Sequence, residues 1–203
     1  MNSLAMNIGQ RQLESAFDKT KAQLTAPKTS IDWNDFNWPP FLNIIHFKLS
    51  ELKDPHLLPC RRLYGLFWLM VAHSVLNLVS IIIQVATGYS ALRILASILI
   101  NFILLVVAAF ALYNGYRGIC QDSSLLLRYK IATIFIILLH FPMWIANTLN
   151  FNGIVRADRS FSDGNSFAGV VCVIEIIYIL LMDALMMWQL VLMFKWSGPL
   201  VNY

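Results

Sequence analysis

The sequence LYGLFWLMVAHSVLNLVSIIIQVA, residues 63 to 86, decides the fold of this chain. It contains no Asp, Glu, Lys or Arg and consists mainly of aliphatic and aromatic side chains. An α-helix rises about 1.5 Å per residue and the hydrocarbon layer of a bilayer is about 30 Å thick, so about twenty apolar residues cross it. The stretch therefore predicts a transmembrane helix.

Three further stretches have the same character, namely residues 94–113, 131–149 and 167–194. The chain of 203 residues is 58% hydrophobic and 13% charged, with a mean hydropathy of +0.64, which is too apolar for an ordinary water-soluble domain. We predict an all-α polytopic membrane protein built as a four-transmembrane-helix bundle. An N-terminal cytosolic amphipathic arm (residues 1–62) precedes the bundle, and a short cytosolic tail (residues 195–203) follows it.

Basic residues are distributed unequally between the two sides of the predicted bundle. Twelve Lys and Arg side chains lie on the side that holds both termini and the loop between the second and third spans, whereas Arg93, Arg156 and Arg159 lie on the other side. Because Lys and Arg are enriched on the cytosolic side of membranes, both termini are predicted to be cytosolic. The first span is expected to act as its own targeting signal.

The two connections on the opposite side differ in length. Residues 87–93 are so few that the first two spans must form a tight antiparallel hairpin, with Gly88 in the turn. Residues 150–166 are rich in Asn, Gly, Ser and Asp and predict a polar loop without a folded domain. This arrangement excludes a receptor with a large ectodomain.

Three segments of the arm suggest contact with a membrane surface. Residues 10–24 predict a short amphipathic helix that lies on lipid or pairs with a partner helix. A cluster of aromatic and proline residues then suits the headgroup region. Apolar residues in 41–52 recur every three or four positions, which predicts an interfacial helix or, equally, a helix packed on the bundle. The predicted headgroup contacts are Trp33, Trp38, Pro39, Pro40 and Phe41.

Three sequence motifs carry a resemblance to a known family. NWPP at residues 37–40 is followed by RRLYGLFWLMVAHS at residues 61–74, and YNGYR at residues 113–117 follows the second span. In order and spacing these resemble the secretory carrier membrane proteins over about residues 37 to 195. The resemblance implies a non-enzymatic role in vesicle transport and exocytosis, in secretory or endosomal vesicles, the Golgi or the plasma membrane. No Asn-Pro-Phe tripeptide occurs, so the chain resembles a divergent short member without that adaptor motif.

The segment after the second span offers aromatic and basic groups at the inner leaflet. Tyr113, Tyr116 and Arg117 can contact anionic lipid, where each basic group gains about 1 kcal/mol. The alternative is that Tyr and Arg merely anchor the helix ends. Cys60 and Cys120 lie beside spans on the same side, where reversible palmitoylation is a second hypothesis.

Polar residues within the spans predict an intramembrane polar layer. His73, Asn101, His140 and Asp183 lie near the midpoints of the four spans, and Glu175 lies about 12 Å along the helix from Asp183. Such groups can hydrogen-bond one another and fix the register of a small bundle. They can also form a proton or cation route, because His titrates near neutral pH.

The sequence contains none of the motifs that would identify an enzyme, a cofactor site, a metal site or a nucleic-acid-binding surface. The leading hypothesis, which the family resemblance implies, is a membrane-trafficking protein whose partners are membrane lipids, further copies of itself or a larger membrane complex. Two alternatives stay open: a small transporter or channel subunit that uses the polar layer, and a structural subunit of a larger membrane complex.

Overall fold

The computed structural model describes residues 31–146 and 152–196, and the predicted helix at residues 10–24 lies outside them. The described residues form five α-helices and no strand, and four of the helices are long and apolar enough to cross a membrane. The prediction of an all-α protein with four membrane-capable helices is confirmed. These four are α2 (Leu57–Ala86), α3 (Leu92–Cys120), α4 (Leu125–Ile145) and α6 (Ser166–Phe194).

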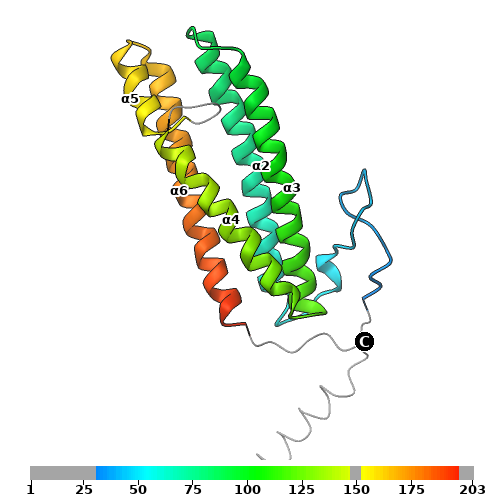
Figure 1. Cartoon of the computed structure of the whole chain (residues 1–203). Helices are drawn as coiled ribbons and strands as arrows, with labels where there is room; N and C mark the ends of the chain where they lie inside the picture. Colours follow the sequence, from blue (N-terminus) through cyan, green and yellow to red (C-terminus); the bar gives the residue numbers. More distant parts are fainter. Residues whose placement is uncertain (1–30, 147–151, 197–203) are drawn as a thin grey trace, which may run out of the picture. The chain divides into compact units, whose positions relative to one another are not determined.

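The four long helices pack side by side in the ring order α2, α3, α4, α6 (Figure 1). Each contacts its two neighbours in the ring. We call the end that holds the α2–α3 connection the turn end. The opposite end holds the start of α2, the α3–α4 connection and the end of α6, and we call it the arm end.

The helices extend beyond the predicted spans at the arm end. α2 begins six residues before residue 63, and Pro59 lies in its first turn, where a missing N–H does no harm. α3 continues to Cys120, so YNGYR is helical. Gly115 and Gly118 permit this extension to pack closely, because a Cβ on Gly118 would lie 2.8 Å from the backbone nitrogen of Leu126. At the turn end, Gly88 adopts a positive φ of 101°, as the predicted tight turn requires.

The predicted interfacial helix at residues 41–52 is wrong. A single 3-10 turn, Leu49–Glu51, is the only helix in that segment. Pro39 and Pro40 lack backbone donors, and the chain instead folds back so that Trp38 bridges to Ile45. Asn43, with a φ of 48°, helps to close the turn. The apolar spacing that resembled a helix therefore belongs to a hairpin.

The predicted polar loop at residues 150–166 is also wrong in part. Residues Ile154–Ser162 form α5, which packs against α6 at the turn end. Arg156, Ala157 and Ser160 are buried, whereas the apolar side chains of Ile154 and Val155 are exposed. Because the polar face points inward, average composition gave no sign of this helix.

Candidate functional site

One cluster of buried polar side chains lies where α2, α4 and α6 meet, and we call it the histidine cluster. The Nδ1 atom of His140 lies 2.7 Å from Oδ1 of Asp183. The rings of His73 and His140 pack edge to face with centroids 5.4 Å apart, and the other side of His73 stacks on Tyr178. Both histidines are fully buried, and Asp183 is 8% exposed.

The histidine cluster leaves ring nitrogens without hydrogen bonds. Both nitrogens of His73 and Nε2 of His140 are buried and have no partner among the described residues. Pairing with His140 reduces the cost of placing the Asp183 carboxyl group in a membrane, since an isolated ionised group there is unfavourable by about 2.5–3.5 kcal/mol. The unpartnered nitrogens are the feature that a proton route would use.

A second cluster, the asparagine cluster, lies nearer the turn end. The carbonyl oxygen of the Asn77 side chain accepts hydrogen bonds from Ser97 and from Asn101, each at 2.8 Å. The amide nitrogen of Asn77 donates to the Glu175 carboxylate. The amide of Asn152 donates to the other Glu175 oxygen at 3.0 Å. This network joins α2, α3, α6 and the segment before α5.

The structure divides the five predicted polar-layer residues between these two clusters. His73, His140 and Asp183 meet in the histidine cluster, whereas Asn101 and Glu175 belong to the asparagine cluster. Sequence reasoning missed Asn77, although a signal was present on α2. Polar residues recur there every three or four positions and form one buried face: His73, Asn77, Ser80 and Gln84.

Two basic residues lie close to the asparagine cluster. Arg93 donates to the side-chain oxygen of Asn152 at 3.4 Å. Arg156 of α5 is fully buried against the ring of Tyr89, and its guanidinium nitrogens have no hydrogen-bond partner among the described residues. Burial lowers the pKa of Arg156 from its usual value. The turn end therefore holds acidic, amide and cationic groups together.

The arm end is held by aromatic packing, which we call the aromatic cluster. Phe47 packs against Tyr116 and Tyr64, with ring centroids 4.8 and 5.1 Å apart. Trp33 packs against Tyr116 at 5.6 Å, and the Arg117 guanidinium lies 5.5 Å from the centre of the Trp33 ring. These contacts attach the segment before α2 to α2 and α3.

The predicted headgroup residues differ in exposure. Phe41 is 81% exposed and Pro40 is also exposed, whereas Trp38 and Pro39 are half-buried. Tyr116 is fully buried, so it packs inside the aromatic cluster instead of making the predicted lipid contact.

The remaining predicted headgroup residues, Trp33, Tyr113 and Arg117, are half-buried beside one another. Arg117 donates to the Tyr113 hydroxyl at 3.1 Å and lies over both aromatic rings. The structure therefore brings these three together at the arm end of α3.

A buried histidine fixes the base of the hairpin. Nδ1 of His46 lies 2.8 Å from the backbone carbonyl oxygen of Asp35, and Nε2 lies 3.1 Å from the Glu51 carboxylate. Lys48 also pairs with Glu51 at 2.8 Å, and this contact raises the pKa of Lys48. These contacts hold the two sides of the hairpin together where the hairpin meets the bundle.

The two cysteines considered for palmitoylation face each other inside the arm end. The sulfur atoms of Cys60 and Cys120 are 4.0 Å apart, and both residues are fully buried. An acyltransferase cannot reach these thiols unless the ends of α2 and α3 separate. The structure therefore favours a packing role for both cysteines.

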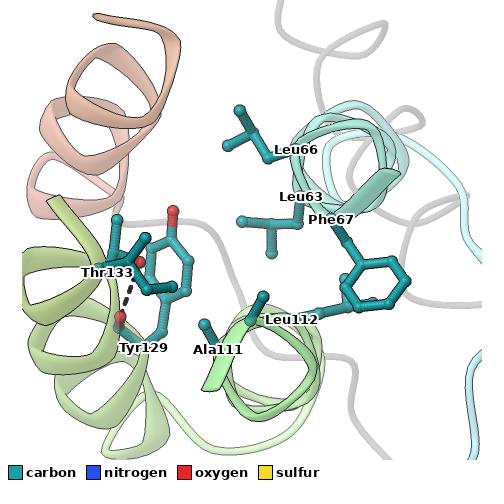
Figure 2. A pocket seen from close by; sticks show the side chains of 9 residues that line it. Leu63, Leu66, Phe67, Ala111, Leu112, Tyr129 and Thr133 are labelled. Carbon is teal, nitrogen blue, oxygen red and sulfur yellow. Dashed lines mark hydrogen bonds between the residues drawn. The ribbon is translucent and has the colours of Figure 1, made fainter. Parts of the chain in front are cut away.

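A small cavity lies between α2, α3 and α4 near the arm end. Figure 2 shows Tyr129 and Thr133 of α4 facing Leu63 of α2 and Ala111 of α3. Its volume is about 30 Å³, enough for a water molecule but too small for a substrate.

No group of three or more metal-ligating side chains occurs in residues 31–146 and 152–196.

These features define the class: a four-span polytopic membrane protein with a polar core at one end of the bundle and an aromatic, closely packed other end. The SCAMP family model matches residues 35–198, and the chain belongs to that family. The resemblance predicted from the sequence motifs is confirmed. The family is one of membrane trafficking and is not known as enzymatic. Comparisons with curated proteins and with solved structures gave no match.

Proposed function

We propose that this protein is a non-enzymatic component of secretory or recycling vesicles that acts in vesicle transport and exocytosis. Membership of the SCAMP family over residues 35–198 is the observation that carries this proposal. In the proposed orientation both termini are cytosolic, so the arm and the α3–α4 connection face the machinery of the cytosol. The partners we propose are membrane lipids and further copies of the chain or a larger membrane complex.

The described surface suits a component that acts within the membrane plane. α3 presents a row of exposed apolar side chains to its surroundings, which are suited to lipid or to a neighbouring helix. The connection between α3 and α4 is only four residues long and carries Asp122. The exposed apolar residues of α3 include Leu95, Ile98, Phe102, Ile103 and Val106.

The proposal is tested in cells depleted of the protein. We expect slower release of a secreted reporter, restored both by the intact chain and by Asp183→Asn, because a scaffold does not need the histidine cluster to titrate. The position of a tagged chain in the same cells shows whether the protein is found on secretory vesicles. Normal reporter release in depleted cells, with the tagged chain absent from those vesicles, would contradict the proposal.

A second candidate function is a proton or cation route through the bundle. The observation that favours it is the histidine cluster, where His73 and His140 carry unpartnered nitrogens beside Asp183. This function predicts a flux of protons or cations, driven by a pH gradient, across liposomes that contain the purified chain. The flux should disappear in Asp183→Asn and in His73→Phe, and reporter release should then be restored by the intact chain alone.

A further inference from the structure

The hairpin of residues 37–45 has the composition of a membrane-inserted segment. No charged residue occurs between Asp35 and Lys48. Its tip exposes large apolar side chains, because Phe41 is 81% exposed, Leu42 58% and Ile44 60%. Water does not favour such a tip, whereas lipid does.

The backbone of the hairpin is also suited to lipid, where unsatisfied N–H groups are costly. Asn37 and Trp38 donate to the carbonyl of Ile45, and Ile44 and Ile45 donate to that of Trp38. The N–H groups of residues 42 and 43 donate to the carbonyl of residue 39. Residues 39 and 40 are prolines and have no N–H, so the Phe41 N–H is the only backbone donor in residues 37–45 without a backbone partner in the described structure.

The hairpin runs back along the bundle and does not point away from it. Trp38 packs edge to face on Phe67 of α2, with ring centroids 5.1 Å apart. Figure 1 shows the hairpin (blue) rising from the arm end beside the helices. Leu42 and Ile44 share a groove with Phe102, which lies far along α3 from its arm end at Cys120. The hairpin is therefore at a depth that belongs to the hydrocarbon layer.

The groove between the hairpin and α3 is apolar and has the length of a lipid chain. Its volume is about 580 Å³. Along α3 it extends from Phe102 to Tyr113, a rise of roughly 16 Å, which is about half of the hydrocarbon thickness of a bilayer. Residues that line it include Trp38, Leu42, Ile45, Phe102, Val106 and Phe110.

We propose that residues 37–45 form a re-entrant hairpin in the leaflet on the arm side, and that the groove holds one acyl chain of a glycerophospholipid from that leaflet. The groove has one leaflet's length and an apolar wall on both sides, and a hydrocarbon chain matches both properties. The proposal depends on the bundle crossing a membrane and does not depend on a trafficking role. The hairpin displaces lipid from one leaflet only.

The depth of the hairpin is tested with a fluorescent probe on a single cysteine. Cys60, Cys120 and Cys172 are replaced by Ala, and Phe41→Cys is compared with Lys53→Cys, an exposed position beyond the base of the hairpin. In phosphatidylcholine vesicles, nitroxides on the acyl chain should quench the probe at position 41 more than headgroup nitroxides do, and the reverse should hold at position 53. Equal reaction of both cysteines with a membrane-impermeant maleimide would overturn the re-entrant hairpin.

Occupation of the groove is tested with a photoreactive phosphatidylcholine whose acyl chain carries a diazirine. In nanodiscs of phosphatidylcholine, the lipid should crosslink to residues 37–47 and to the facing part of α3. Ala109→Trp fills the groove and should abolish these crosslinks, whereas Ala96→Trp, on the same helix outside the groove, should retain them. Val106→Trp, at an exposed position in the groove wall, is a second variant with the same expected loss.

Two results would overturn the lipid-filled groove. One is crosslinking of residues 37–47 that is equal in Ala109→Trp, Val106→Trp and Ala96→Trp. The other is the absence of lipid crosslinks at residues 37–47 in the intact, folded chain, as expected if a second copy of the chain and not lipid fills the groove. Size-exclusion profiles of the variants establish that each is folded before the lipid result is interpreted.

Discussion

The two ends of the bundle are held together by different physical interactions. At the turn end, a single amide, Asn77, connects Ser97, Asn101 and Glu175 through hydrogen bonds. At the arm end, α3 and α4 approach through Gly118, and aromatic rings around Tyr116 attach the preceding segment. Hydrogen bonds depend on specific partners, whereas close packing depends on volume, so the two ends should respond to different substitutions.

The largest effect is expected at the turn end from Asn77→Leu. Three interhelical hydrogen bonds at about 0.6 kcal/mol each, together with the loss of a donor to buried Glu175, give a destabilisation of about 2–3 kcal/mol. Unfolding in mixed micelles of increasing SDS content measures the change. Ser74→Ala is the matched control, because the only hydrogen bond of the Ser74 hydroxyl among the described residues is to the Met70 carbonyl of its own helix. A loss as large in Ser74→Ala would refute the special role of Asn77.

At the arm end, Gly118→Ala should destabilise the bundle by about 1–3 kcal/mol, because the added methyl group meets the backbone of Leu126 and α3 and α4 must separate. Gly65→Ala should cause no loss, since a Cβ there has no neighbour within 4 Å. The same unfolding assay compares the two alanine variants. Equal behaviour would show that close packing does not hold the arm end.

The histidine cluster lies between the two ends and should contribute less. We expect a coupling free energy between His140 and Asp183 of about 0.6–1.7 kcal/mol, the range for hydrogen-bonded pairs in membrane proteins. A double-mutant cycle with His140→Leu, Asp183→Leu and the double variant measures it. If the effects of the two substitutions on stability are additive, the contact between His140 and Asp183 does not help to hold the bundle together.

The smallest effect is expected from Tyr116→Phe. The ring packing of Tyr116 is retained, and only a long hydrogen bond of 3.5 Å to the Lys48 carbonyl is lost, so the change should be about 0.5 kcal/mol or less. The unfolding midpoint should therefore stay close to that of the intact chain. A large loss would mean that the hydroxyl, and not the ring, holds the aromatic cluster together.

The sequence predicted the four long helices because each contains a mainly apolar stretch of about the length that a bilayer requires. It also predicted that Gly88 lies in the turn between the first two spans, because a tight antiparallel turn needs a residue that tolerates positive φ. These features depend on local composition. Which polar side chains meet across the bundle does not follow from local composition. For that reason one polar layer was expected where two clusters occur.

The two segments that were predicted wrongly failed for different reasons. Residues 41–52 have helical apolar spacing, but Pro39 and Pro40 direct the backbone into a hairpin. Helix α5 was missed because its polar residues face α6 and its apolar residues face outward. Apolar spacing misled the prediction in the first segment, and average composition misled it in the second.

We expect the buried polar groups to hold the bundle together without conducting ions. The most direct test is pH-gradient-driven proton flux into liposomes that contain the purified, folded chain, compared with empty liposomes. The proton flux into the two kinds of liposome should be the same, and Asp183→Asn should leave that flux unchanged. A flux above that of empty liposomes, lost in both Asp183→Asn and His73→Phe, would show instead that the protein is a carrier.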